Sequence, residues 1–109
     1  RRPWLIKLSE LLDKCMRGKG AVLACSALKE SYRQLLRSKT DQMIWIHLVG
    51  SYELIRKRIE SRTGHFMKTK LLRSQYDILE SPPYAIEIDT RGDVEQTVEK
   101  ILKKIKEHG

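Results

Sequence analysis

Residues 43–50 read MIWIHLVG and form the most hydrophobic stretch of this 109-residue chain. The polar turn SKTDQ comes before this stretch and Ser51 follows it, so it is bounded on both sides. A short, continuously apolar run of this kind is typical of a strand that is buried on both faces of a parallel sheet. Two further strands are predicted, because residues 21–25 read AVLAC and residues 84–89, YAIEID, alternate in polarity.

Helical patterns separate these predicted strands. Apolar residues recur at steps of three and four from Trp4 to Met16, with Pro3 in the first turn. Ser26 is the predicted cap of the next helix. The inward face of that helix is predicted to hold Leu28, Tyr32, Leu35 and Leu36.

The second half of the chain continues the alternation. Ser51 opens a helix that Gly64 breaks, and Thr69 is the predicted cap of another helix, which Pro82 and Pro83 end. Asp93 and Gln96 form a capping pair for the last helix. Its inward face is predicted to hold Val94, Val98, Ile101, Leu102 and Ile105.

The order of these elements predicts an α/β fold, with a parallel sheet and helices on both of its faces. A chain of this length suffices for one domain with one core, so residues 1–109 are predicted to form a single domain.

The composition indicates an anionic partner. Lysine and arginine number 22 against 14 acidic residues, which gives a net charge of +8. Nucleotide phosphates, a phosphorylated or carboxylate substrate, nucleic acid and an anionic surface all fit that charge. Cys15 and Cys25 lack the spacing of a metal site and indicate reduced thiols. No apolar run approaches the ~18 residues of a membrane span, so we expect a soluble, cytoplasmic protein with no membrane partner.

The segment 58–80 reads RIESRTGHFMKTKLLRSQYDILE, and it is strongly basic as far as Arg73. Arg58 and Arg62 stand four residues apart, so both project from one face of a helix, a spacing that suits bidentate contact with phosphate oxygens. We therefore predict a helical lid over about 58–80 that binds phosphate. A solvated basic helix face is the alternative interpretation.

Three blocks resemble a known family: RRPWL at the start, ACSALKESYRQLLR at 24–37, and RIESRTGHFMKTKLLRSQYDILESP at 58–82. They are similar, in order and separation, to blocks of the gluconokinase family, small P-loop kinases that transfer the γ-phosphate of ATP to gluconate. The resemblance implies a nucleoside-kinase-like fold with a five-stranded parallel sheet and a closing lid. It also implies that ATP and Mg²⁺ are used.

The resemblance assigns roles to individual residues. Arg58 and Arg62 would be catalytic, holding the ATP phosphates and stabilising the transferring group. Lys29, Tyr32 and Arg33 follow the AVLAC strand and would bind gluconate, whose carboxylate suits arginine and lysine. Core packing is an alternative role for Tyr32.

Three more residues are predicted to contact the substrate. Arg1 matches the arginine of the family pattern Asp-Arg-x-Pro-Trp. His65 would lie at the turn of the lid, where a hinge, a packing contact or a general base are alternative roles. Gln75 would bind substrate or cap the lid loop.

One family motif does not occur: the sequence contains no G-x-x-x-x-G-K-[ST]. This glycine-rich loop cradles phosphates and helps to hold Mg²⁺, and in the family it lies in a segment that precedes Arg1. By the family's topology, the first strand of that segment lies between the AVLAC and MIWIHLVG strands. We therefore expect this chain to be part of a longer kinase and to be inactive by itself. Two alternatives stay open: its strands pair in another order, or it assembles with another chain.

Alternatives also stay open for the molecule that accepts the phosphoryl group and for the class of function. The segment after Glu80, SPPYAIEID, is shorter than in the family, so a related sugar acid or polyol stays open. The rival function is a noncatalytic basic module that binds nucleic acid or a partner chain. Proteins that bind single-stranded nucleic acid need aromatic residues interleaved with basic ones. Only Phe66 and Tyr76 are near the basic residues of this sequence, so nucleic acid is not the expected ligand. A homodimer stays open.

Overall fold

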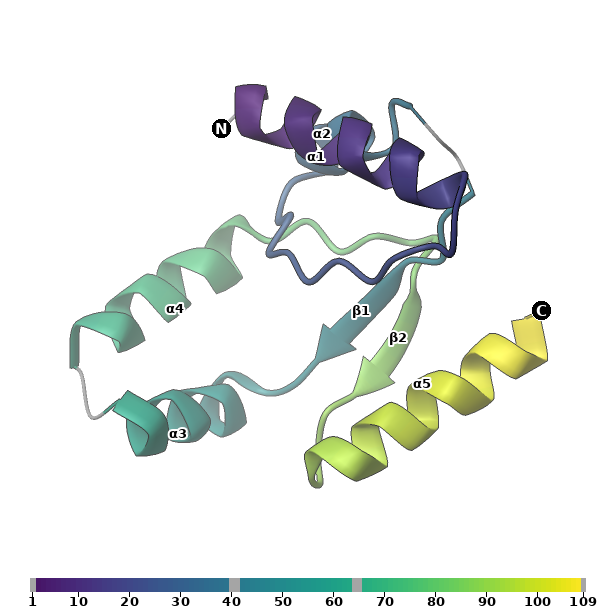
Figure 1. Cartoon of the computed structure of the whole chain (residues 1–109). Helices are drawn as coiled ribbons and strands as arrows, with labels where there is room; N and C mark the ends of the chain where they lie inside the picture. Colours follow the sequence, from purple (N-terminus) through teal and green to yellow (C-terminus); the bar gives the residue numbers. More distant parts are fainter. Residues whose placement is uncertain (1, 40–41, 64–65, 109) are drawn as a thin grey trace. The chain divides into compact units, whose positions relative to one another are not determined.

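The computed structural model (Figure 1) describes residues 2–39, 42–63 and 66–108, and their side chains outside residues 62–70 and 108. The elements follow in the order α1 (Arg2–Met16), α2 (Glu30–Leu36), β1 (Ile46–Val49), α3 (Tyr52–Thr63), α4 (Phe66–Ile78), β2 (Ile86–Asp89) and α5 (Val94–His108). The predicted α/β class is confirmed. None of these described helices has the length and apolar character that crossing a membrane requires.

The chain divides into two compact units. The first comprises Arg1–Met43 and Ile78–Ser81, and the second comprises Ile44–Asp77 and Pro82–Gly109. That residues 1–109 form a single domain stays a prediction.

In the first unit, α1 packs against α2. The contact buries Leu5 and Ser9 of α1 and Leu36 of α2. Ser9 satisfies its hydroxyl inside its own helix by donating to the Ile6 carbonyl at 2.6 Å. The predicted first helix is therefore confirmed, but only part of its apolar stripe is buried: Leu5 lies in the core, whereas Trp4 and Leu11 are exposed.

In the second unit, β1 and β2 pair in parallel, in a register that places Ile46 opposite Ile86 and Val49 opposite Asp89. A parallel pair requires a long crossover, which α3 and α4 provide in this unit (Figure 1). The chain then returns along β2, beside which α5 lies. Ile88 on β2 is fully buried, so the second core is centred on this strand.

Local capping determines where several helices begin. The Leu54 N–H donates to Ser51 Oγ at 3.1 Å at the start of α3, as predicted. Asp93 and Gln96 also form the predicted reciprocal pair, because each main-chain N–H donates to the other side chain, at 2.9 and 2.8 Å.

Two predicted caps are wrong. Lys29, not Ser26, is the N-cap residue of α2. Thr69 lies inside α4, which begins at Phe66. The predicted break at Gly64 lies outside the described residues.

The predicted AVLAC strand is wrong. Residues 20–28 have no regular secondary structure, and Val22 has a relative exposure of 101%. A strand is stable only when its main-chain groups pair with a neighbour. In the part of the chain that the structure describes, the sheet contains only β1 and β2. The apolar run therefore has the composition of a strand without a strand to pair with.

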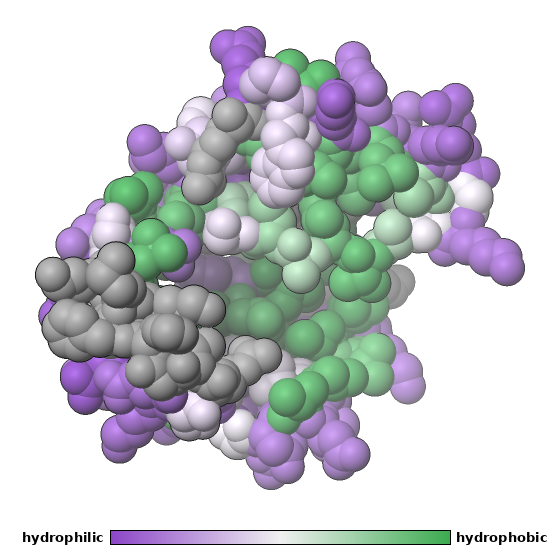
Figure 2. Space-filling view, turned by 60° about the vertical axis from the view of Figure 1, so that its left-hand side comes forward, coloured by the Kyte–Doolittle hydropathy of each residue, from purple (hydrophilic) through white to green (hydrophobic). Residues whose placement is uncertain are grey.

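The burial predicted for β1 and α5 is only partly observed. Leu48 on β1 is 54% exposed, although the MIWIHLVG segment was predicted to be buried on both faces. On α5, Ile101 and Ile105 are half-buried as the periodicity predicts, whereas the inward positions predicted for Val94, Val98 and Leu102 are wrong because these side chains are exposed. Figure 2 shows that hydrophobic atoms, in green, are open at the surface of the face in view. These elements therefore carry apolar faces that the described residues do not cover.

Gly92, in the turn between β2 and α5, provides a test of this local structure. Its φ is +98°, and an added Cβ would overlap the Gln96 side chain that caps α5. Gly92→Ala should therefore lower the free energy of unfolding by about 2 kcal/mol, from the left-handed backbone and the disturbed cap. Denaturant titration measures this change.

Gly20→Ala is the matched control, since Gly20 has φ +85° but an added Cβ meets nothing within 4 Å. This variant should lose only the part of the unfolding free energy that comes from the left-handed backbone, about 1 kcal/mol. Equal losses in the two variants would contradict a role of Gly92 in the cap.

Candidate functional site

Open parallel sheets bind ligands beyond the carboxyl ends of their strands. In the second unit, this edge follows Val49 on β1 and Asp89 on β2. Thr90, the residue after β2, donates to the Val49 carbonyl twice, from its N–H at 2.9 Å and from Oγ1 at 3.0 Å. The two strands are therefore held together at the edge where a ligand is expected.

Gly50 lies at the tightest point of this edge. A Cβ at this position would lie 2.8 Å from Thr90 Oγ1 and 3.0 Å from Ile55 Cδ1, so the close approach requires glycine. The Gly50 carbonyl accepts a hydrogen bond from the Tyr76 hydroxyl of α4 at 2.7 Å. Burial raises the pKa of Tyr76, so the hydroxyl keeps its proton and remains a donor.

Arg58 of α3 binds the other side of the same edge. Its Nη2 donates to the carbonyls of Thr90, at 2.5 Å, and Gly92, at 3.0 Å. The family resemblance implies that this guanidinium holds the ATP phosphates, whereas in this structure it holds the turn after β2. A guanidinium has five N–H donors, and both of these bonds use Nη2. Contact of Arg58 with phosphate through the other donors stays a prediction.

The other residues of the predicted lid are only partly described. Arg62 lies one turn after Arg58 on α3, so the backbone places both on one face of that helix. The side chain of Arg62 lies outside the described residues, as do Arg1 and His65 altogether. The roles predicted for these three residues stay predictions.

An aromatic cluster joins α3 to α4. The Tyr52 and Tyr76 rings meet edge to face, with centroids 5.7 Å apart, and the Arg73 guanidinium lies 4.3 Å from the centroid of Tyr52. Gln75, the residue before Tyr76 on α4, is half-buried, and its predicted contact with the substrate stays a prediction. The cluster was not predicted from the sequence, in which the spacing of Arg73 and Tyr76 by three residues on one helix is a weak signal.

In the first unit, Lys29 and Tyr32 lie at the start of α2. Lys29 is exposed, and its Nζ lies 5.8 Å from the centroid of the half-buried Tyr32 ring. The Lys29 carbonyl accepts the N–H groups of Tyr32 and Arg33, at 3.0 and 3.2 Å. An exposed cation beside an aromatic ring remains available to an anionic ligand, so their predicted role in binding the acceptor is consistent with this geometry.

Arg33 differs from these two residues because its guanidinium is buried; only 3% of the residue is exposed. Nε donates to Glu30 Oε1 at 3.0 Å, Nη1 donates to the Ala27 and Leu28 carbonyls at 2.9 and 3.3 Å, and Nη2 donates to the Glu80 carbonyl at 2.6 Å. We call these five residues the Arg33 cluster. Its arginine fork is occupied by the protein itself, which argues against the direct contact with gluconate that the sequence suggested.

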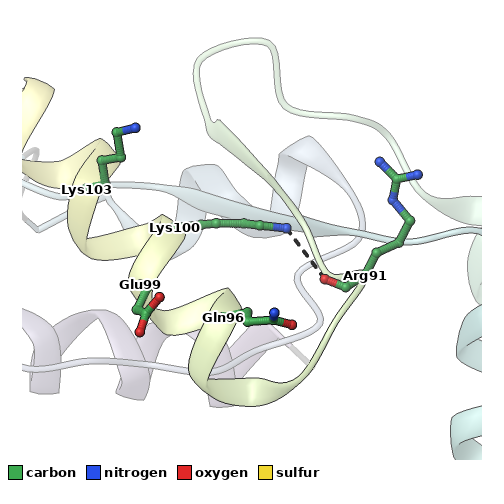
Figure 3. A pocket seen from close by; sticks show the side chains of 5 residues that line it. All are labelled: Arg91, Gln96, Glu99, Lys100 and Lys103. Carbon is green, nitrogen blue, oxygen red and sulfur yellow. Dashed lines mark hydrogen bonds between the residues drawn. The ribbon is translucent and has the colours of Figure 1, made fainter.

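A cavity of about 370 Å³ lies beside α5 and is lined by Arg91, Gln96, Glu99, Lys100 and Lys103 (Figure 3). The labelled side chains fan out and do not converge on one point. Lys100 Nζ donates to the carbonyls of Asp89, at 3.1 Å, and Arg91, at 3.5 Å. The N–H of Arg91 is the main cause that lowers the pKa of Asp89 below its usual range. Several polar groups that line this cavity thus already form hydrogen bonds within the protein, and we assign the cavity no ligand.

No family model matches the chain, but individual proteins do. The thermoresistant gluconokinase of Escherichia coli (strain K12) is 36% identical over 112 residues, which cover 94% of this chain and 64% of that protein. The probable gluconokinase of Mus musculus is 35% identical over 125 residues, which cover 98% of this chain and 67% of that protein. The chain belongs to the gluconokinase family.

A solved structure extends this likeness to the fold. The crystal structure of a gluconokinase from Sinorhizobium meliloti matches with a TM-score of 0.78 and 33% identity, over 93% of this chain and 58% of that one. The resemblance of the three sequence blocks to the gluconokinase family is thereby confirmed, together with the P-loop type of fold. The chain spans about three fifths of the length of relatives such as these.

Tyr76 gives a test at the carboxyl edge. Tyr76→Phe leaves the Gly50 carbonyl without this donor and should cost about 1 kcal/mol of unfolding free energy at neutral pH. Because burial raises the pKa of Tyr76 in the folded state, its stabilisation is fully present below about pH 10 and is lost as the pH rises past that value. The difference in stability between the two proteins should therefore narrow above about pH 10.

Urea unfolding at several pH values measures this effect. Tyr52→Phe keeps the ring contacts of Tyr52 and is the matched control, with an expected change of less than about 0.5 kcal/mol. A Tyr76→Phe variant as stable as the unmodified protein would contradict a structural role for the hydroxyl.

Proposed function

We propose that the protein to which this chain belongs transfers the γ-phosphate of ATP to gluconate and forms 6-phosphogluconate. The observation that carries the proposal is the 36% identity to the thermoresistant gluconokinase of Escherichia coli, over 94% of this chain. The basic character of α3, which carries both Arg58 and Arg62, fits the same chemistry.

In this proposal, α3 supplies the cation for the transferring group. Phosphoryl transfer requires positioning and neutralisation of charge more than covalent chemistry. Arg58 anchors α3 to the turn after β2 through its two carbonyl contacts. Arg62 lies one turn further on in the same helix, so the anchored Arg58 also holds the part of α3 that carries Arg62. We assign charge neutralisation to Arg62, and to Arg58 both anchoring and contact with the ATP phosphates.

The acceptor site is assigned to the start of α2. Lys29 is the exposed cation there, and the Tyr32 hydroxyl is a candidate donor to the hydroxyls of a sugar acid. We retain Gln75, His65 and Arg1 as further contacts of the acceptor.

The residues of this chain do not make a complete site for ATP and Mg²⁺. The sequence has no G-x-x-x-x-G-K-[ST], and the described residues contain no group of three or more His, Cys, Asp or Glu placed to hold a metal ion. We therefore expect the phosphate cradle and the Mg²⁺ ligands only in a protein that carries the glycine-rich segment of the family. These 109 residues by themselves are expected to be inactive.

The proposed activity is tested with the protein that includes that segment. It should convert gluconate and ATP to a phosphate ester and ADP in equal amounts, whereas the 109-residue chain should form neither. Product formation is measured by phosphorus NMR and ADP by a coupled assay. Other sugar acids and polyols serve as competing acceptors. Phosphorylation of one of these in preference to gluconate would change the acceptor, and the absence of any ester would refute the kinase assignment.

Arg62 is tested by kinetics in the same protein. Arg62→Ala should lower kcat by about 100-fold or more, with gluconate KM nearly unchanged, because the lost interaction forms only in the transition state. Lys57→Ala is the matched control: Lys57 is an exposed cation of the same helix, and its removal should change kcat by less than about twofold. A kcat that survives the loss of Arg62 would remove this arginine from the mechanism.

A further inference from the structure

We propose that Arg33 is a positioning residue for the acceptor: it orients Lys29 by fixing the main chain just before it. This inference rests on the proposed function, because it takes Lys29 as the group that meets the sugar acid. It replaces direct recognition by Arg33, which the sequence suggested.

The Arg33 cluster joins two segments that are far apart in the sequence. Arg33 reaches the Ala27 and Leu28 carbonyls at 2.9 and 3.3 Å, and the Glu80 carbonyl at 2.6 Å. Glu80 makes two further bonds: its N–H donates to the Leu28 carbonyl at 2.8 Å, and its Oε1 accepts the Glu30 N–H at 2.7 Å. One guanidinium therefore holds the residues before Lys29 against the segment that leaves α4.

Burial makes a second role for this guanidinium costly. A carboxylate ligand would have to take donors from three main-chain carbonyls and from Glu30, whose Oε1 lies 3.0 Å from Nε. Breaking such contacts in a buried site leaves polar groups without partners. Lys29, by contrast, is exposed. The geometry thus separates a side chain that can meet a ligand from one that holds it in place.

The orientation of Lys29 depends on the carbonyls that Arg33 binds. Lys29 is the N-cap of α2, in an extended conformation with φ −106° and ψ 145°. Its carbonyl is tied to the first turn of α2, but its extended φ and ψ mean that the direction of its side chain also depends on the main chain of the two preceding residues. A planar fork with several donors can hold those carbonyls and Glu80 together, whereas a lysine ammonium offers a single point of contact.

The test is Arg33→Lys in the protein that carries the glycine-rich segment, with gluconate as the acceptor. Gluconate KM should rise about tenfold, because Lys29 is displaced. The kcat and the KM of ATP should stay within about twofold, because the residues of α3 that contact the ATP phosphates are not displaced. Arg37→Lys is the matched control: Arg37, the C-cap residue of α2, pairs with Glu30 at 2.6 Å but does not contact the main chain before Lys29 in the contacts described above. It should leave gluconate KM within about twofold.

Glu80→Ala is the second variant, and it decides the question if Arg33→Lys does not fold. It removes the acceptor for the Glu30 N–H but keeps the two main-chain bonds of Glu80, so gluconate KM should rise about threefold. A lower melting temperature with unchanged gluconate KM would show that Arg33 only stabilises the fold and would overturn the inference. A parent protein that phosphorylates no sugar acid would instead overturn the proposed function, and the positioning role with it.

Discussion

The carboxyl ends of β1 and β2 depend on donors that the strands themselves do not supply. Beyond Val49 and Thr90, the ladder of strand hydrogen bonds stops, and the carbonyls of Gly50, Thr90 and Gly92 follow. Tyr76 of α4 satisfies the first of these and Arg58 of α3 satisfies the other two. Unsatisfied carbonyls at this edge would be costly, so α3 and α4 are attached to the edge of the sheet at which ligands bind in such folds.

This attachment explains why an arginine that looks catalytic in the sequence has a structural contact here. The spacing of Arg58 and Arg62 on one helix is visible in the sequence, and it predicts a shared face correctly. The partners of Arg58 lie 32 and 34 residues further along the chain, and no local pattern indicates them. The same applies to Arg33, whose bond to Glu80 spans 47 residues.

Local signals predicted the elements whose stabilising contacts are local. The first helix, the capping pair of Asp93 and Gln96, and the positions of the strands β1 and β2 agree with the structure. The AVLAC segment shows the limit of such reasoning, because the apolar character of a strand is encoded in its residues but its pairing is not. Lys29, not Ser26, is the N-cap of α2, and the main chain between them is bound by Arg33, which also bonds Glu80, 47 residues away.

The open apolar faces have a consequence for the behaviour of the polypeptide. Val22 is fully exposed, Leu48 is half exposed on a strand, and Val94 lies open at the start of α5. Strand edges and apolar patches of this kind recruit other chains and are aggregation hazards. These 109 residues produced by themselves should thus accumulate in inclusion bodies or be retained by molecular chaperones, and detergent or a solubilising fusion partner would be needed to recover them.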